Sequence, residues 1–334
     1  MLEFINSTLN NLIITRIYDI VAALIISIPI GVIQYKMHWN MQPILWNLLD
    51  KGFKPQLIKL NNQKKNEQTL FFRGLFVVCI FIALTAILLI GLNIAEHIAL
   101  IGSQIDTITL SLCLVTIYPF LLNRYVQKEY KEQKKLSATL LNIISASTMR
   151  AVNTADESAI NRYIISMSVM SFTRYFIAPI LFYLIGGVAL LLIGSIFLWL
   201  AARIGSGVLT GAYSYAITIF EELLAVLPNF FATTLLIMAT LLTPKTKFTA
   251  ALHALTIKHS GHLLPGAHPL AIVAHCINIS IGGKMKSSYG YMIERPWHGP
   301  KDAKAKVEAA QTFHAQYLIA IAHILALFGL LILQ

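Results

Sequence analysis

Charge is scarce in this sequence. Only 12% of the 334 residues are Asp, Glu, Lys or Arg, whereas about 25% is usual in a soluble globular protein. Acidic residues are fewer than basic ones: the chain has 15 Asp and Glu and 26 Lys and Arg. So little charge cannot cover the surface of a water-soluble chain of this length, which excludes an ordinary soluble domain.

Cysteine is also rare, and the three cysteines show no paired spacing. Cys79, Cys113 and Cys276 lie in or beside apolar runs. This placement predicts small buried hydrophobic side chains and no disulfide framework.

Apolar residues, in contrast, are abundant. They make up 57% of the chain, and the mean hydropathy is +0.69. Six apolar runs are long enough to span a bilayer: about 12–34, 75–95, 99–122, 175–202, 218–242 and 316–333. We predict an all-α, polytopic integral membrane protein with about six transmembrane helices, forming a single membrane domain over residues 1–334.

The ends of some runs are poorly defined. Asp106 lies in the third run, and Gly186-Gly187 interrupts the fourth. Arg16 and Asp19 fall inside the first run, and no small-residue cleavage site follows it, so no cleavable signal peptide is expected.

The basic residues indicate the topology. Seven Lys and Arg lie in residues 36–73, eight in 123–174 and nine in 245–306, which leaves only Arg16 and Arg203 elsewhere. By the positive-inside rule, three partly helical loops at about 36–73, 123–174 and 245–315 face the cytoplasm of a bacterial inner (plasma) membrane, and both chain ends face outward. The net charge of +11 then reflects topology and attraction to anionic membrane lipids, and nucleic-acid binding is not expected.

The last basic loop has the composition of a binding site. Pro265 and Pro269 predict a short helix from Ala271 to Ile281, beginning after Pro269 and stopped by Gly282-Gly283. Glycines allow close backbone approach, basic side chains bind phosphate or carboxylate, and tryptophan offers a flat apolar face. The residues of this kind that follow the helix are Gly282, Gly283, Lys284, Lys286, Tyr289, Glu294, Arg295 and Trp297.

The second basic loop begins with a charged segment at 123–135, expected to be a solvated helix. It continues into RAVNTADESAINRY, where Thr154 and Glu157 match a capping box. Asp156 and Glu157 are open to two interpretations: acids at a helix N-terminus, or residues that line a site with Arg150 and Arg162.

Several of these motifs resemble one membrane-protein family. The Gly-Gly after a short apolar helix, the later Tyr-Gly and above all ERPWHGP at 294–300 resemble the C-terminal signature of the adenosylcobinamide-phosphate synthase family, the CobD/CbiB-type proteins of cobalamin biosynthesis. The run at 150–166 is similar to a second family motif, and the segments at 178–187 and 221–230 are similar to two more. The resemblance covers roughly residues 140–305.

The resemblance implies a ligase that joins the carboxylate of a corrinoid, adenosylcobyric acid, to the amine of an aminoalcohol phosphate, with ATP and Mg²⁺ as cofactors. It implies catalytic roles for Glu294, Asp156 and Glu157. It implies substrate binding by a larger group: Arg150, Arg162, Gly282, Gly283, Lys284, Lys286, Tyr289, Arg295 and Trp297.

Two alternatives stay open. Acidic residues of the family are replaced by Ala151, Ile165 and Leu270, and FTRYFIAPILFYLIGG at 172–187 is closer to AmpE, a related membrane protein not known as an enzyme. This favours a non-catalytic sensor or accessory protein. The cluster His253, His259, His262, His268 and His275 allows a third hypothesis, a metal or haem membrane protein.

Overall fold

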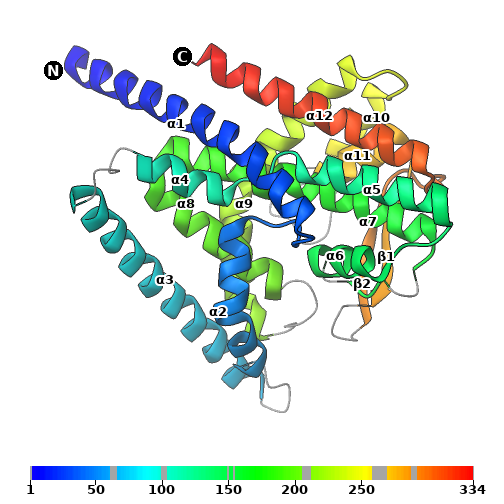
Figure 1. Ribbon diagram of the computed structural model, residues 1–334, viewed down its shortest axis with the longest axis horizontal. Coiled ribbons are helices and arrows are strands. Elements are labelled where there is room, and N and C mark those ends of the chain that lie inside the picture. Colours follow the sequence, from blue (N-terminus) through cyan, green and yellow to red (C-terminus); the bar gives the residue numbers. More distant parts are fainter. Residues whose placement is uncertain are drawn as a thin grey trace.

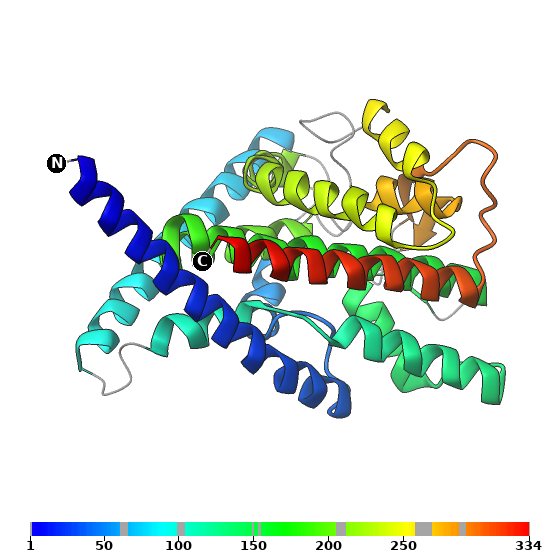
Figure 2. The ribbon, with the colours of Figure 1, turned by 90° about the horizontal axis from the view of Figure 1, so that it is seen from above.

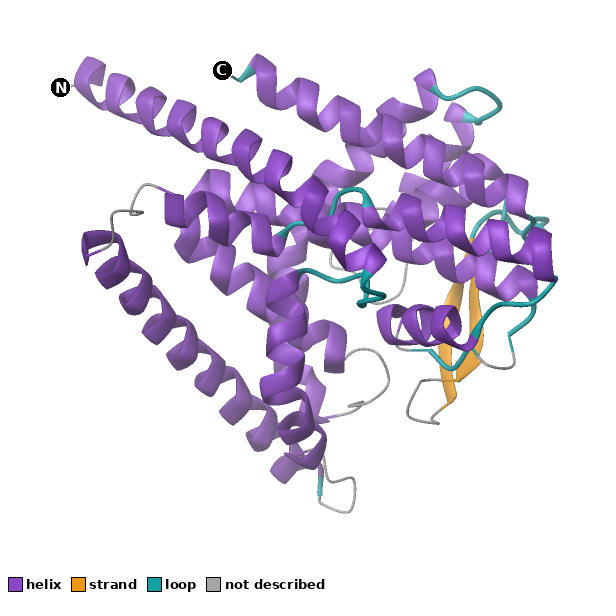
Figure 3. Ribbon diagram, in the orientation of Figure 1, coloured by secondary structure: helices purple, strands orange, loops and turns teal. Residues whose placement is uncertain are grey.

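A computed structural model describes residues 2–60, 66–98, 104–148, 150–152, 155–204, 212–257, 269–286 and 292–333. Within these ranges the side chains of residues 2–10, 58, 95–98, 204, 216, 284–286 and 292–296 are not described. Helices dominate, and two short strands form the sheet seen in Figure 3.

The elements follow one another as short and long helices. They are α1 (Leu2–Lys36), α2 (Ile44–Leu60), α3 (Glu67–Ile98), α4 (Ile105–Cys113), α5 (Tyr118–Gln133), α6 (Ala138–Thr148), α7 (Glu157–Met170), the π-helix η2 (Ser171–Ile177), α8 (Ala178–Ile204), α9 (Ala212–Leu242), α10 (Phe248–Thr256), α11 (Pro269–Ile277), β1 (Ile281–Lys286), β2 (Met292–His298) and α12 (Ala309–Ile332). Both chain ends lie toward one end of the molecule and the strands toward the other (Figures 1 and 2).

The predicted membrane architecture is confirmed. Within the described residues, six helical segments are long and apolar enough to cross a membrane: Asn11–Lys36, Glu67–Ile94, Ile105–Gln133, Glu157–Arg203, Ala212–Leu242 and Ala309–Ile332. The protein is therefore an all-α, multi-pass membrane protein. Two of the six segments, the third and the fourth, are not single straight helices.

The third segment is broken between α4 and α5, where the sequence predicted one span over 99–122. Pro119 lies in the first turn of α5, where proline starts a helix without losing a hydrogen bond. The Val115 N–H in the break donates to the carbonyl of Tyr175 in the π-helix (2.9 Å). The residue four positions after Tyr175 is Pro179, which has no N–H to offer that carbonyl, so the break supplies the partner that the helix lacks.

The fourth segment folds back on itself at Gly187, within the Gly186-Gly187 interruption that the sequence showed in the run at 175–202. Gly187 has φ 61° and ψ −155°, a conformation open essentially to glycine alone. A Cβ on Gly194 would overlap the ring of Phe182. Those two residues would lie about 18 Å apart along a straight helix. Residues 178–204 therefore form two helical arms joined at Gly186-Gly187.

The ends of this helical hairpin meet at one tryptophan. The ring centroids of Trp46 and Tyr175 are 4.8 Å apart, and Arg203 Cζ lies 5.8 Å from the Trp46 ring centroid. A straight helix would place Tyr175 and Arg203 about 42 Å apart. The two arms therefore begin and end at the same level, beside α2.

A buried ion pair fastens the second arm to α2. Arg203 Nε is 2.5 Å from Asp50 Oδ1, and the side chains are 4% and 15% exposed. Trp199 Nε1 donates to the same carboxylate (2.9 Å), and Arg203 also donates to Gln42 Oε1 (2.6 Å). Helix α2 is thus anchored by its inner face, while Leu48 remains exposed.

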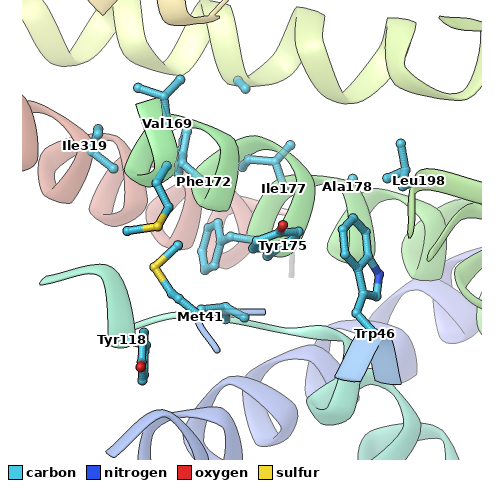
Figure 4. Packing of buried hydrophobic residues seen from close by; sticks show 14 of the residues in the cluster. Met41, Trp46, Tyr118, Val169, Phe172, Tyr175, Ile177, Ala178, Leu198 and Ile319 are labelled. Carbon is cyan, nitrogen blue, oxygen red and sulfur yellow. The ribbon is translucent and has the colours of Figure 1, made fainter. Parts of the chain in front are cut away.

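Aromatic side chains form much of the core around the π-helix. Figure 4 shows Met41 and Trp46 turned toward Phe172 and Tyr175, and all four are buried. The ring of Trp46 meets that of Tyr175 edge to face. Truncating a buried aromatic residue of this kind costs about 3–5 kcal/mol, so this cluster is a principal support of the fold.

Two of the three cysteines are buried as predicted. Cys113 and Cys276 are 1% exposed, and Cys79 lies on the exposed face of α3. Cys276 is in α11, outside the membrane-spanning segments. Burial raises the pKa of its thiol to about 12. Its Sγ donates to the Val273 carbonyl (3.3 Å), so it is a packed, unreactive thiol.

Candidate functional site

The N-terminus of α7 carries the acidic pair at Asp156 and Glu157. Asp156 has extended backbone (φ −73°, ψ 168°), and its Oδ1 accepts the N–H of Ala159 (2.7 Å). Asp156 is therefore the N-cap. The predicted capping residue, Thr154, lies outside the described residues. Both acidic side chains are exposed, so the structural interpretation of Asp156 holds and leaves Glu157 open to solvent.

Arg150 lies just before this helix and is 5% exposed. Its guanidinium carbon stands 4.7 Å from the ring centroid of Tyr163, which is a cation–π contact. Its backbone exchanges hydrogen bonds with Ser145, whose hydroxyl donates to the Arg150 carbonyl (2.6 Å). Arg150 thus joins α6 to α7 and is not positioned on the surface.

One face of α7 binds the segment that precedes α12. The Ser158 hydroxyl accepts the Val307 N–H (2.7 Å), and Arg162 donates to the carbonyl of Ala305. Asn161 Nδ2 donates to the Val307 carbonyl (3.1 Å). These contacts join residues 143 to 149 positions apart in the chain, and so the second and third basic loops meet here.

Asn161 also belongs to a buried amide network. Gln127 Nε2 donates to Asn161 Oδ1 (2.8 Å) and Asn123 Nδ2 donates to Gln316 Oε1 (2.9 Å). Gln316 in turn donates to the carbonyl of Pro119 (3.0 Å). The segment expected to be a solvated helix at 123–135 is therefore α5, with Asn123 and its neighbours turned inward. Most of its charges lie on the exposed side of the helix, but Glu129 is buried with Asn123 and accepts the Ser137 N–H (2.8 Å).

The last basic loop forms a β-hairpin where the sequence predicted a longer helix and a loop. α11 ends at Ile277, because Asn278 adopts φ 61° and so stops the helix before the glycines. Gly282 and Gly283 are in β1, and ERPWH belongs to β2. The register sets residue 284 opposite 294 and residue 283 opposite 295, with an irregularity between 281 and 283.

Trp297 lies across the backbone of Gly283. A Cβ on Gly283 would overlap its indole ring, and Gly283 has φ +86°. Even so, Trp297 is 54% exposed, while the next residue, His298, is 7% exposed. The glycine thus supports one face of the indole and leaves the other open to a planar ligand.

We expect Gly283→Ala to open this hairpin. A side chain at positive φ costs about 1–2 kcal/mol, and the overlap with Trp297 adds to it. Amide hydrogen exchange in 281–286 and 292–298 should therefore accelerate about tenfold or more, since 1.4 kcal/mol is a factor of ten. Gly52→Ala, on α2 with open space around the new Cβ, is the matched control and should leave this exchange unchanged. Unaltered exchange in Gly283→Ala would contradict the contact.

The structure brings together only some of the residues predicted for the site. Ser158, Asn161 and residues 305–307 join α7 to the segment after β2, and the sequence analysis did not single them out. The one available signal was the three-residue spacing of Ser158 and Asn161, which places both on one face of α7. Tyr289 lies outside the described residues. Four predicted residues are placed only by their backbone in the strands: Lys284, Lys286, Glu294 and Arg295.

Histidine and acidic side chains do not assemble a metal site in the part of the chain that the structure describes. His253 and His275 approach each other, with ring centroids 6.3 Å apart. His323 packs among Phe120, Phe172 and Phe176. His259, His262 and His268 lie outside the described residues.

Comparison with known proteins adds no relative. No family model, curated protein or solved structure matches the chain. The motifs and their placement in the structure are therefore the basis for the proposed function.

Proposed function

We propose that this multi-pass membrane protein acts as an adenosylcobinamide-phosphate synthase type of ligase. Its corrinoid and aminoalcohol phosphate substrates would bind beside the hairpin and the segment before α12, which α7 holds by hydrogen bonds. The observation that supports this best is the hydrogen bonding of Ser158, Asn161 and Arg162 to residues 305–307. These bonds join the motif at 150–166 to the segment that follows the ERPWHGP motif along the chain.

The groups offered here suit a flat, anionic substrate. The open face of Trp297 fits a corrin macrocycle. The register sets residue 295 opposite Gly283, so Arg295 would supply the positive charge that a phosphate requires on the face of Trp297. Residues 284, 286 and 294 fall on the other face of the hairpin, from which Lys284 and Lys286 would add charge and Glu294 would supply a base for the ammonium proton. In this proposal the three basic loops lie on the cytoplasmic side of a bacterial inner membrane. Both substrates are soluble in the cytoplasm.

The described carboxylates do not fit a Mg²⁺–ATP complex. Asp156 is engaged as a helix cap, and the described residues hold no group of three or more acidic, histidine or cysteine side chains for a metal. Magnesium at a nucleotide is held by carboxylates together with phosphate oxygens.

That mismatch favours a second candidate, a non-catalytic, AmpE-like relative that binds the same kind of ligand. Arg150 is buried beneath Tyr163 and Arg162 is bound to Ala305, so two of the predicted substrate-binding residues serve the fold. A protein that kept the scaffold and the hairpin would bind ligand without joining two substrates.

One experiment separates these functions. Purified protein in lipid nanodiscs is given adenosylcobyric acid, ATP, Mg²⁺ and labelled aminopropanol phosphate, and both corrinoid binding and label incorporation are measured. For the synthase, Arg295→Ala should lower incorporation about 10- to 100-fold, because a hydrogen bond to a charged group contributes about 1.5–3 kcal/mol. Lys128→Ala, at an exposed position on α5, is the control and should have no effect.

The outcomes are distinct. Corrinoid binding that is weakened by Trp297→Ala, with no incorporation by the wild-type protein, would establish the second candidate. Absence of both binding and incorporation would reject both candidates.

A further inference from the structure

Helix α2 lies between two membrane-spanning segments and stays on one face of the bilayer. The first segment, Asn11–Lys36, ends before α2, and the second, Glu67–Ile94, begins after it. If α2 crossed the membrane, residues 61–66 would have to cross it back, and so short a stretch reaches only about 20 Å of the roughly 30 Å required. Helix α2 is therefore placed where these two segments meet the membrane surface.

Contacts near both ends of α2 join it to the ends of spanning segments. Asp50 pairs with Arg203, the last residue of the fourth segment. Arg73 Nη1, in the second turn of α3, donates to the carbonyl of Leu60 (3.2 Å). Figure 1 shows α2 running at a steep angle to α1 and α12. The helix therefore extends along the membrane surface and not into the bilayer.

The inner face of α2 packs against the protein. Trp46, Leu49 and Leu57 are 1%, 5% and 3% exposed. Phe53 meets Phe81 of α3, with ring centroids 5.3 Å apart. These positions recur every three or four residues, as the buried stripe of an amphipathic helix requires.

The outer face of α2 carries lysines beside exposed apolar groups. Lys51 and Lys59 are exposed and lie about 12 Å apart along the helix axis. Leu48, one turn before Lys51, is 57% exposed, and Trp39, which precedes the helix, is 43% exposed. Lysines next to exposed apolar and aromatic side chains are typical of a helix that lies among lipid headgroups.

The charge of this loop has one sign. Asp50 is the one acidic residue in the sequence from 37 to 66, and it is turned inward to Arg203. The same stretch has a larger set of basic residues: Lys51, Lys54, Lys59, Lys64 and Lys65. The outer face of α2 is therefore complementary to an anionic surface.

We propose that the outer face of α2 binds the headgroups of anionic phospholipids. Lys51 and Lys59 donate to the phosphate oxygens, and Leu48 lies against the acyl chains of the same lipids. Each lysine near an anionic membrane surface strengthens binding about fivefold. Phosphatidylcholine binds less well, because its headgroup carries an ammonium group that repels lysine. A bound anionic lipid then holds α2 against α3 and the second arm of α8.

Lipid competition, measured by native mass spectrometry on the full chain, tests the binding. The wild-type protein should retain phosphatidylglycerol in preference to phosphatidylcholine, by about tenfold or more. Lys51→Gln combined with Lys59→Gln should lose most of this preference, and the two arginine variants should keep it. Lys131→Gln with Lys135→Gln, two exposed lysines at the end of α5, makes the same change of net charge and is the control. An unchanged preference in the α2 variant, or an equal loss in the control, would overturn the proposal.

Hydrogen exchange locates the lipid. In nanodiscs that hold a single copy of the protein, adding phosphatidylglycerol to phosphatidylcholine should slow exchange in residues 44–60 about threefold or more, because a ligand that binds only the folded helix opposes its opening. The effect should be absent in the α2 variant and shrink at high salt. Inorganic phosphate added to phosphatidylcholine discs should not reproduce it. Exchange that phosphatidylglycerol leaves unchanged, or that phosphate slows equally, would contradict a lipid site on α2.

Discussion

Asp50→Ala is expected to lower the free energy of unfolding by about 3–5 kcal/mol, because it leaves the buried guanidinium of Arg203 without its counter-charge. Arg203 is 4% exposed and makes contacts at 2.5 Å with both oxygens of Asp50. The indole N–H of Trp199 loses its acceptor as well. The measurement is an SDS titration in mixed micelles, followed by circular dichroism.

A double-mutant cycle separates the ion pair from general damage. Asp50→Ala combined with Arg203→Met should be less destabilised than Asp50→Ala alone, since no buried charge remains. Lys51→Ala, on the exposed side of α2, should change stability by less than about 0.5 kcal/mol. Additive losses in the cycle would contradict the pairing of α2 with the end of α8.

Gly194→Ala is expected to destabilise the protein by about 1–3 kcal/mol, although the same change in an exposed helix interior stabilises by about 1 kcal/mol. The sign reverses because the new Cβ would overlap the ring of Phe182 in the opposite arm. The unfolding titration described above measures the change. Gly91→Ala on α3, with open space around its Cβ, should show the ordinary stabilising effect.

The partner ring offers a second check. In a Phe182→Ala background the overlap is gone, so Gly194→Ala should become neutral or stabilising. Such a change of sign requires contact between residues 182 and 194, which only the folded-back form of α8 provides. If Gly194→Ala stabilises the protein equally in both backgrounds, α8 is a straight helix and the hairpin is wrong.

The candidate site shows where sequence reasoning reaches its limit. Composition indicated that the last basic loop handles a polar ligand, but helix and strand compete within so short a segment. Asn278, not the glycine pair, ends α11, because its left-handed backbone conformation stops the helix first. Asp156 also had two valid interpretations, and the contact with the Ala159 N–H shows that it caps α7.

The sequence by itself determined the membrane class, the six apolar segments and the three basic loops, because these follow from local hydrophobicity and charge along the chain. Only the tertiary structure decided that the fourth segment turns back at Gly187, that α4 and α5 are separate, and that Asp50 pairs with Arg203. The reason is that long-range contacts supply the hydrogen-bond partners that broken helices lack in an apolar environment. Which residues supply them depends on packing between distant segments, and no local pattern records it.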